Sequence, residues 1–218
     1  YMSIKPGRNL TLFYACFCIA IGSSIGVALS QNLFTLFLFY ELITISTYPL
    51  VTYSGTDESR KAGRTYLGIL IGTSMAFFLI AIVWTWNIAG TTSFVKGGIL
   101  NGEASPLIAG LLYTLFVFGI AKAALMPFHH WLPSAMVAPT PVSALLHAVA
   151  VVKTGVFAIL KITLYIFGSD FLSGSNITTP ILWIGSITIV LTSLIALTQN
   201  NLKRRLAYST ISQLSYII

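Results

Sequence analysis

Long apolar runs, separated by short polar or Gly/Pro-containing segments, dominate the pattern of this chain. The runs are continuous over about 20 residues, as in GILIGTSMAFFLIAIVWTW, and do not alternate between apolar and polar positions. About 20 apolar residues in a helix cross the hydrocarbon core of a bilayer. The pattern predicts seven spans, at residues 9–30, 32–53, 63–86, 106–135, 140–167, 180–199 and 204–218. The seventh is too short to cross, so we expect the chain to be a piece of a longer protein.

The composition supports a membrane location. Hydrophobic residues make up 56% of the chain and charged residues 8%, and the mean hydropathy is +0.87. Soluble domains have about 25% charged residues, so this chain has too few to cover a surface exposed to water. A transmembrane β-barrel would show alternating segments of about ten residues. The predicted fold class is therefore all-α, a polytopic transmembrane helix bundle.

The fourth predicted span contains a proline that a regular helix does not tolerate. Pro127 has no N–H group, and its ring clashes with the carbonyl of Ala123, so the helix must kink or break there. Broken helices at membrane depth occur where they are buried in protein or line a hydrated cavity. We expect one broken helix near Pro127, with the break about one turn beyond Lys122.

Basic residues concentrate on one side of the predicted membrane. This side holds the N-terminal segment and the loops at 54–64 and 200–205, with Lys5, Arg8, Arg60, Lys61, Arg64, Lys203, Arg204 and Arg205. The opposite side holds Lys96 and Lys161. Lys- and Arg-rich loops stay cytoplasmic, so we expect the first side to face the cytoplasm, or the matrix or stroma of an organelle. The net charge of +7 then reflects topology at an anionic lipid bilayer, without nucleic acid as a partner.

Three charged residues fall deep inside predicted spans: Glu41, Lys122 and Lys153. A charge at the bilayer centre costs about 2.5–3.5 kcal/mol on the most lenient scale, so such residues usually face the bundle interior and mark ion or proton pathways. We predict that they form a proton relay. The alternatives are a glutamate that only fixes helix packing through a partner, and a lysine that extends to the interface.

Polar residues at helical spacing accompany these charges. Thr44 and Tyr48 follow Glu41 on one stripe of the second span. On the fifth span His147 aligns with a second polar stripe that includes Ser143 and Thr154. Histidine titrates near neutral pH and can pass protons through either ring nitrogen, so His147 is a fourth candidate relay residue. Its alternative is a hydrogen-bonded packing role.

No metal or cofactor is expected in this chain. His129 and His130 are adjacent, so their side chains point about 100° apart on a helix and make a poor metal site. They are accessory candidates near the break. Cys16 and Cys18 are also poorly placed for a shared ligand, and the chain has no cysteine cluster or Gly-rich phosphate loop. We therefore expect no catalytic centre here, which leaves open whether the chain is a subunit of an enzyme.

Three segments resemble one family of membrane proteins. They are GIAKAALMPFHHWLPSAMVAPTPVSALLHAVAVVKTGVF at 119–157, FLFYELITISTYPLV at 37–51 and LKRRLAYSTISQLSYI at 202–217. They are similar to the antiporter-like subunits shared by Mrp-type cation/proton antiporters and respiratory complex I. Within the family the D-type Mrp subunit looks most similar, and complex I subunits are close rivals.

The resemblance implies a fold of about fourteen helices with inverted five-helix repeats, each containing a broken helix. The whole chain, 1–218, would be a translocating domain corresponding to helices 4 to 10, with 32–167 as the core of the first repeat. Glu41 would occupy the family glutamate on helix 5, Lys122 the lysine on broken helix 7, and Lys153 the lysine on helix 8. His147 matches a histidine that some members have on helix 8.

The implied function is proton translocation within a multisubunit Na⁺/H⁺ antiporter. The alternative is a proton-pumping subunit of NADH:quinone oxidoreductase or of a related membrane-bound hydrogenase. Both imply other membrane subunits as partners, protons as the transported species and, for the antiporter, Na⁺. We expect a multi-pass protein of the bacterial cell membrane.

Overall fold

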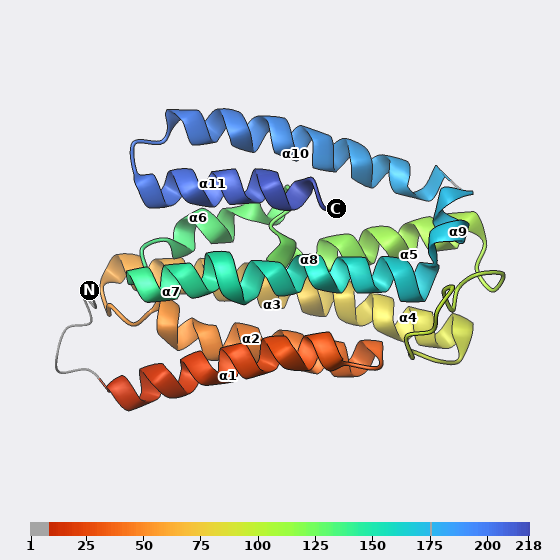
Figure 1. Ribbon diagram of the computed structural model, residues 1–218, viewed down its shortest axis with the longest axis horizontal. Helices are drawn as coiled ribbons and strands as arrows, with labels where there is room; N and C mark the ends of the chain where they lie inside the picture. The colour runs from red at the N-terminus through yellow and green to blue at the C-terminus, as the bar shows by residue number, and fades with distance from the viewer. Residues whose placement is uncertain (1–8, 175) are drawn as a thin grey trace.

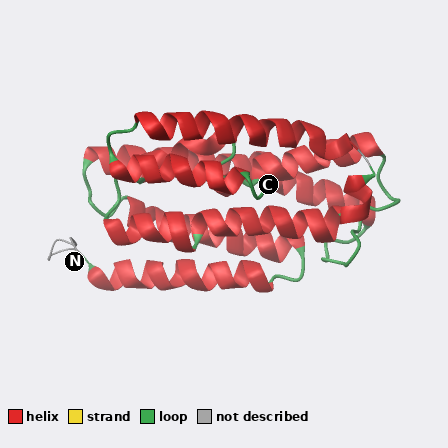
Figure 2. Ribbon diagram, turned by 45° about the horizontal axis from the view of Figure 1, so that its top comes forward, coloured by secondary structure: helices red, strands yellow, loops and turns green. Residues whose placement is uncertain are grey.

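The computed structural model describes residues 9–174 and 176–218, and its helices lie side by side as an elongated bundle (Figure 1). Within these ranges the regular elements are all helical, and the one isolated β-bridge joins Asn32 to Ser93 (Figure 2). Lys5 and Arg8, which contribute to the predicted orientation, lie outside the described residues. The all-α prediction is confirmed.

The connections between successive helices are short except for the one at 90–105. The α-helices are α1 (Leu10–Leu29), α2 (Leu33–Val51), α3 (Asp57–Thr73), α4 (Leu79–Ala89), α5 (Pro106–Gly119), α6 (Trp131–Ala135), α7 (Thr140–Ala144), α8 (Val151–Ile162), α9 (Ser169–Ser173), α10 (Thr179–Thr198) and α11 (Leu202–Ser215). The π-helical segments are η1 (Ser74–Phe78), η4 (Leu145–Val149) and η5 (Thr163–Phe167). The 3₁₀ segments are η2 (Ala121–Ala123), η3 (Phe128–His130) and η6 (Asn176–Thr178).

Five continuous helices in the described ranges are long and apolar enough to cross a membrane. They are Leu10–Leu29, Leu33–Val51, Asp57–Ala89, Thr140–Phe167 and Asn176–Thr198. The other two predicted spans are the interrupted helix that begins with α5, and α11, which has 14 residues. These elements define a polytopic helical membrane protein. The fourteen-helix inverted repeat of the parent fold stays a prediction.

The third span begins at Asp57, before the predicted position 63, because its polar first turn is well capped. The Thr56 side chain accepts a hydrogen bond from the Ser59 N–H at 3.2 Å. Asp57 and Glu58 lie in the first turn, where negative charge is favoured by the helix dipole. Local capping therefore extends the helix into a sequence that hydropathy alone assigns to a loop.

The predicted broken helix is confirmed, and its interruption is longer than Pro127 alone would require. α5 ends at Gly119, upstream of the proline, and α6 begins at Trp131. Between them lie η2 and η3, and Ala124 has a left-handed backbone with φ of 58°. We call residues 120–130, between α5 and α6, the interrupted segment. Lys122 lies inside it, and not one turn before the break as predicted.

The two predicted sides of the membrane correspond to the two ends of the bundle. In Figure 1 the α2–α3 and α10–α11 connections lie at the end where α1 begins. These connections precede the basic residues at the starts of α3 and α11. The α1–α2 turn and the 90–105 connection lie at the opposite end. This arrangement fits the predicted segregation of basic loops.

We predict that Gly155→Ala destabilises the bundle, because α8 touches the interrupted segment through this glycine. A Cβ atom at Gly155 would lie 2.5 Å from the Ala123 nitrogen and 2.6 Å from the Lys122 carbonyl carbon. Backbone atoms cannot move aside as a flexible side chain can, so we expect a loss of about 1–3 kcal/mol in thermal unfolding of the purified protein. Gly68→Ala on α3 is the control, since a Cβ there meets nothing within 4 Å. Equal unfolding temperatures for the two variants would contradict this packing.

Candidate functional site

Lys122 is fully buried in the interrupted segment, with 0% of its surface exposed. Its backbone N–H donates to the Tyr40 hydroxyl at 3.3 Å, and its Nζ donates to the Tyr40 carbonyl on α2. The same Nζ lies 3.3 Å from the centre of the Tyr40 ring. A cation over a desolvated aromatic face is attracted by the ring quadrupole. Tyr40 therefore encloses the lysine head group, and α2 provides both the ring and the acceptor.

Glu41, the next residue on α2, is 8% exposed, and both of its carboxylate oxygens are buried without a hydrogen-bond partner among the described residues. It forms no ion pair within 4.0 Å with Lys122, although the two groups are near enough for a Coulomb interaction. A buried ionised carboxylate without a partner is strongly disfavoured.

A small polar framework holds the break against α2 and α3. The Tyr66 hydroxyl on α3 and the Thr47 hydroxyl on α2 share a hydrogen bond of 2.6 Å. The Trp131 indole N–H donates to the Ala121 carbonyl at 2.9 Å, and the rings of Tyr66 and Trp131 pack edge to face at 5.5 Å. Tyr66 also interacts electrostatically with Glu41. These contacts fix the position of the segment that carries Lys122.

Sequence reasoning missed Tyr40, Tyr66, Trp131 and Gly155 as parts of this site. The available signal was weak, because aromatic residues and glycines are common throughout apolar helices. Tyr40 could have been found by its position next to Glu41. Trp131 could have been found by its position beside the proline break. Their importance comes from contacts between segments distant in the sequence, which spacing along one helix does not show.

Lys153 and His147 share a different cavity, of about 580 Å³, between α8 and α11. The cavity is lined by His147, Ala148, Lys153, Ser209, Thr210, Gln213, Leu214, Tyr216 and Ile217. Lys153 is exposed to it and is not enclosed as Lys122 is. The His147 Nε2 contacts the Leu206 carbonyl at 3.0 Å and the Thr210 hydroxyl, both on α11. Two of the predicted relay residues thus meet at one polar opening.

The two candidate centres lie on different faces of α8. Gly155 of α8 approaches the backbone of Lys122, whereas Lys153, two residues earlier, lines the cavity toward α11. Positions two residues apart point about 200° from each other around a helix. The structure therefore brings Glu41 and Lys122 together, brings His147 and Lys153 together, and separates the two pairs by the body of α8.

The hydroxyl residues predicted as accessory groups bond to nearby backbone carbonyls. Thr44 donates to Tyr40 at 3.5 Å, and Thr154 donates to Ala150 at 2.6 Å. Ser143 donates to Ala138 at 3.1 Å. Each of these donors is buried. Their role in a relay stays a prediction.

The remaining accessory candidates differ in burial. His129 is 6% exposed, and its Nδ1 has no hydrogen-bond partner among the described residues. His130 is exposed, and the two rings lie 4.2 Å apart. Tyr48 is half-buried on α2. In the described part of the chain no group of three or more His, Cys, Asp or Glu residues is arranged to hold a metal ion.

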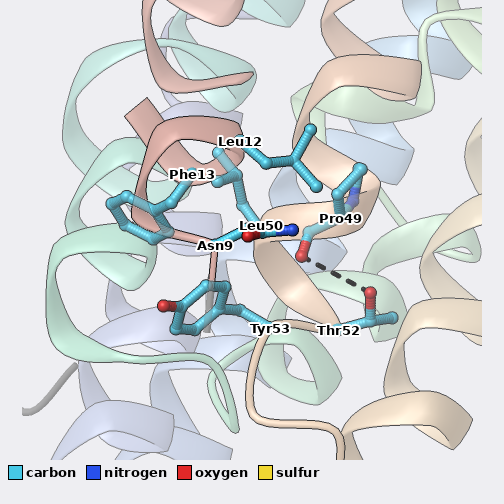
Figure 3. A pocket seen from close by; sticks show the side chains of 7 residues that line it. All are labelled: Asn9, Leu12, Phe13, Pro49, Leu50, Thr52 and Tyr53. Carbon is cyan, nitrogen blue, oxygen red and sulfur yellow. Dashed lines mark hydrogen bonds between the residues drawn. The ribbon is translucent and has the colours of Figure 1, made fainter. Parts of the chain in front are cut away.

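A further groove, of about 300 Å³, lies between the start of α1 and the end of α2 (Figure 3). It is lined by Asn9, Leu12, Phe13, Pro49, Leu50, Thr52 and Tyr53. The Thr52 hydroxyl donates to the Pro49 carbonyl at its edge, at 3.5 Å. None of the predicted relay residues lines this groove, so it is separate from the charged centres.

The fold and these buried charges define a multi-pass membrane protein with charged centres between its helices. Residues 30–218 match the transmembrane family described as NADH:quinone oxidoreductase/Mrp antiporter. The match covers most of the chain, and the chain belongs to this family. The family resemblance of the sequence is confirmed.

The family has two branches among the relatives of this chain, quinone oxidoreductase subunits and antiporter subunits, and both match it at similar identity. NAD(P)H-quinone oxidoreductase chain 5 of Picosynechococcus sp. is 34% identical over 234 residues, covering 100% of this chain and 33% of the relative. A Staphylococcus aureus protein named as antiporter subunit mnhA2 is 36% identical over 228 residues, covering 100% of this chain and 27% of the relative. The chain thus spans about a third of the curated relatives it matches. The predicted closeness to a D-type subunit stays a prediction.

Solved structures of two complexes contain similar chains. The membrane-bound sulfane sulfur reductase, an archaeal respiratory membrane complex, has a chain with a TM-score of 0.82 and 29% identity, over 98% of this chain and 43% of that one. The Mrp complex from Dietzia sp. has a chain with a TM-score of 0.82 and 29% identity, over 94% of this chain and 22% of that one.

We predict that His147→Ala loosens the attachment of α11 to η4, the π-helical segment that precedes α8. The substitution removes the contacts of the imidazole with Leu206 and Thr210. A hydrogen bond contributes about 0.5–1.5 kcal/mol, so amide exchange in Leu202–Ser215 should accelerate roughly two- to tenfold. Hydrogen–deuterium exchange of the protein in nanodiscs measures this. His130→Ala removes an exposed imidazole and is the control; equal exchange in α11 for both variants would disprove the link.

Proposed function

We propose that this chain is the proton-translocating part of a membrane subunit of a multisubunit complex. The observation that carries the proposal is the enclosed Lys122 head group in a broken helix, beside the buried Glu41 carboxylate, which has no hydrogen-bond partner among the described residues. A bundle that only needed to pack would not bury two such groups, because each is costly in a membrane. Membership in the family supports the same reading.

Glu41 and Lys122 act as a switchable pair in this proposal. At an effective dielectric of about 20, unit charges 4 Å apart attract by about 4 kcal/mol, and by about half of that at twice the distance. A small movement of the break relative to α2 therefore changes how strongly Glu41 favours a proton on Lys122. When the carboxylate is farther away or neutral, Lys122 releases its proton more readily.

His147 and Lys153 form the second station. Their cavity between α8 and α11 is large and polar enough to hold water, which can pass protons between side chains that do not touch. The proton that leaves Lys122 passes to this station around α8. His147 suits an intermediate role because an imidazole can pass protons through either ring nitrogen.

The complex is either a Na⁺/H⁺ antiporter or a redox-driven pump. In the first case the proton gradient drives Na⁺ exchange. In the second, electron transfer in other subunits of an NADH:quinone oxidoreductase or a related hydrogenase drives the pumping. We place the subunit in the bacterial cell membrane, with other membrane subunits as partners. Relatives at 34% and 36% identity carry names from both branches, so both remain candidates.

We predict that Lys122→Ala and Glu41→Gln each reduce proton flux by the complete complex about tenfold or more. The loss follows because each change removes one member of the switchable pair, and every 1.36 kcal/mol of added barrier slows a step tenfold. Flux is measured in vesicles with a pH-sensitive dye. Lys61→Ala, which removes an exposed charge on α3, is the control. Wild-type flux in Lys122→Ala would refute the relay.

The same vesicles separate the two driving forces. An imposed Na⁺ gradient drives proton movement in an antiporter, without any electron donor. In a redox-driven pump the protons move only when a donor and a quinone are supplied.

A further inference from the structure

Lys161, near the end of α8, binds the end of α1 through three oxygens. Its Nζ donates to the Ala28 carbonyl at 3.0 Å, to the Ser30 carbonyl at 2.5 Å and to the Ser30 hydroxyl at 3.3 Å. The rings of Phe94 and Phe157 lie on other sides, with centres 4.8 and 5.6 Å from Nζ. The ammonium group therefore sits in a small cage of oxygens and aromatic rings.

The chemistry of this cage is that of a monovalent-cation site. The last carbonyls of a helix lack intrahelical partners and lie at the negative end of the helix dipole. Ser30 is 5% exposed, and its hydroxyl proton is directed to the Val27 carbonyl at 2.7 Å, so its oxygen lone pairs face the cation. Backbone carbonyls that replace a hydration shell are the ligands by which proteins bind K⁺. Among the described residues no carboxylate lies within 4.0 Å of the Lys161 ammonium group, so its partners there are uncharged.

Three separate segments meet at this point, at the end of the bundle opposite the start of α1 (Figure 1). The 91–100 loop bonds to the α1–α2 turn and the start of α2 on one side, and to η5, which follows α8, on the other. These bonds run from Leu33 N to Thr92 O at 2.9 Å, from Phe94 N to Gln31 O at 3.0 Å, and from Ile99 N and Leu100 N to Ile166 O at 2.9 and 3.0 Å. Lys161 adds the direct connection from α8 to α1. A cation here holds α1, the loop and α8 together.

We propose that the oxygens of Ala28 and Ser30, with the Phe94 ring, form a monovalent-cation site whose resident cation is the tethered ammonium group of Lys161. The lysine replaces a free ion, fastens this end of the bundle and excludes small cations from the site. The proposal does not rest on proton translocation. It assigns Lys161 a role different from those of Glu41, Lys122 and Lys153.

The test removes the tethered cation and offers a free one. In the complete complex, Lys161→Ala should lower the Tm by about 2–8 °C, because charged hydrogen bonds are lost and the cage is left empty. Methylammonium or K⁺ at tens of millimolar should restore most of the loss by entering the cage, whereas tetramethylammonium at the same ionic strength should not fit. Lys96→Ala removes an exposed lysine from the same loop and should leave the Tm unchanged.

A second variant separates a cation site from a packing role. Lys161→Met keeps the long side chain and fills the cage, so its Tm should fall and methylammonium should not restore it. The proposal is overturned if Lys161→Ala matches wild type, if no small cation restores it, or if tetramethylammonium restores it equally. If Lys161→Ala yields little folded complex, the readout is that yield with and without methylammonium during solubilisation. Because stability is measured, a failure here is distinct from wild-type proton flux in Lys122→Ala.

Discussion

The enclosure of one ammonium group between α2 and an interrupted helix is the constraint on which the rest of the architecture depends. A charge that faces lipid is costly, so Lys122 needs partners for its ammonium group, and Tyr40 provides a carbonyl acceptor and an aromatic ring. In a continuous helix the backbone N–H and C=O groups would bond to one another. At the break the Lys122 N–H donates to the Tyr40 hydroxyl, and the Ala121 carbonyl accepts from the Trp131 indole as well as from the Ala124 N–H.

α8 connects the charged centres while keeping them apart. Its Gly155 face packs on the interrupted segment, and its Lys153 face opens to the cavity shared with α11. Its far end is fastened to α1 by Lys161. A π-helical segment lies at each end of this helix, and such wide turns occur frequently at functional sites. α8, which carries Lys153, thus contacts the three elements that carry the other proposed relay residues: α2 with Glu41, η2 with Lys122 and η4 with His147.

Hydropathy and proline chemistry were sufficient to predict the spans, the break and the charged residues inside them. They could not show that the helix ends at Gly119, because that end depends on contacts with distant segments. Counting residues along each span predicted the same central depth for Lys122 and Lys153. In the structure Lys122 is enclosed, whereas Lys153 lines a cavity. The difference arises from which neighbour each side chain meets. Tyr40 and Gly155 were missed for the same reason.

The unequal exposure of the two lysines has a consequence for how each one senses its surroundings. Mobile ions screen charges that they can approach within about a Debye length, which is about 8 Å at physiological salt. Lys153 borders an open cavity, so water and ions that enter it would screen the interactions of this lysine. Lys122 has no exposed surface, and its attraction to Glu41 is shielded from that effect. Changes in ionic strength would therefore alter the interactions of Lys153 more than the attraction between Lys122 and Glu41.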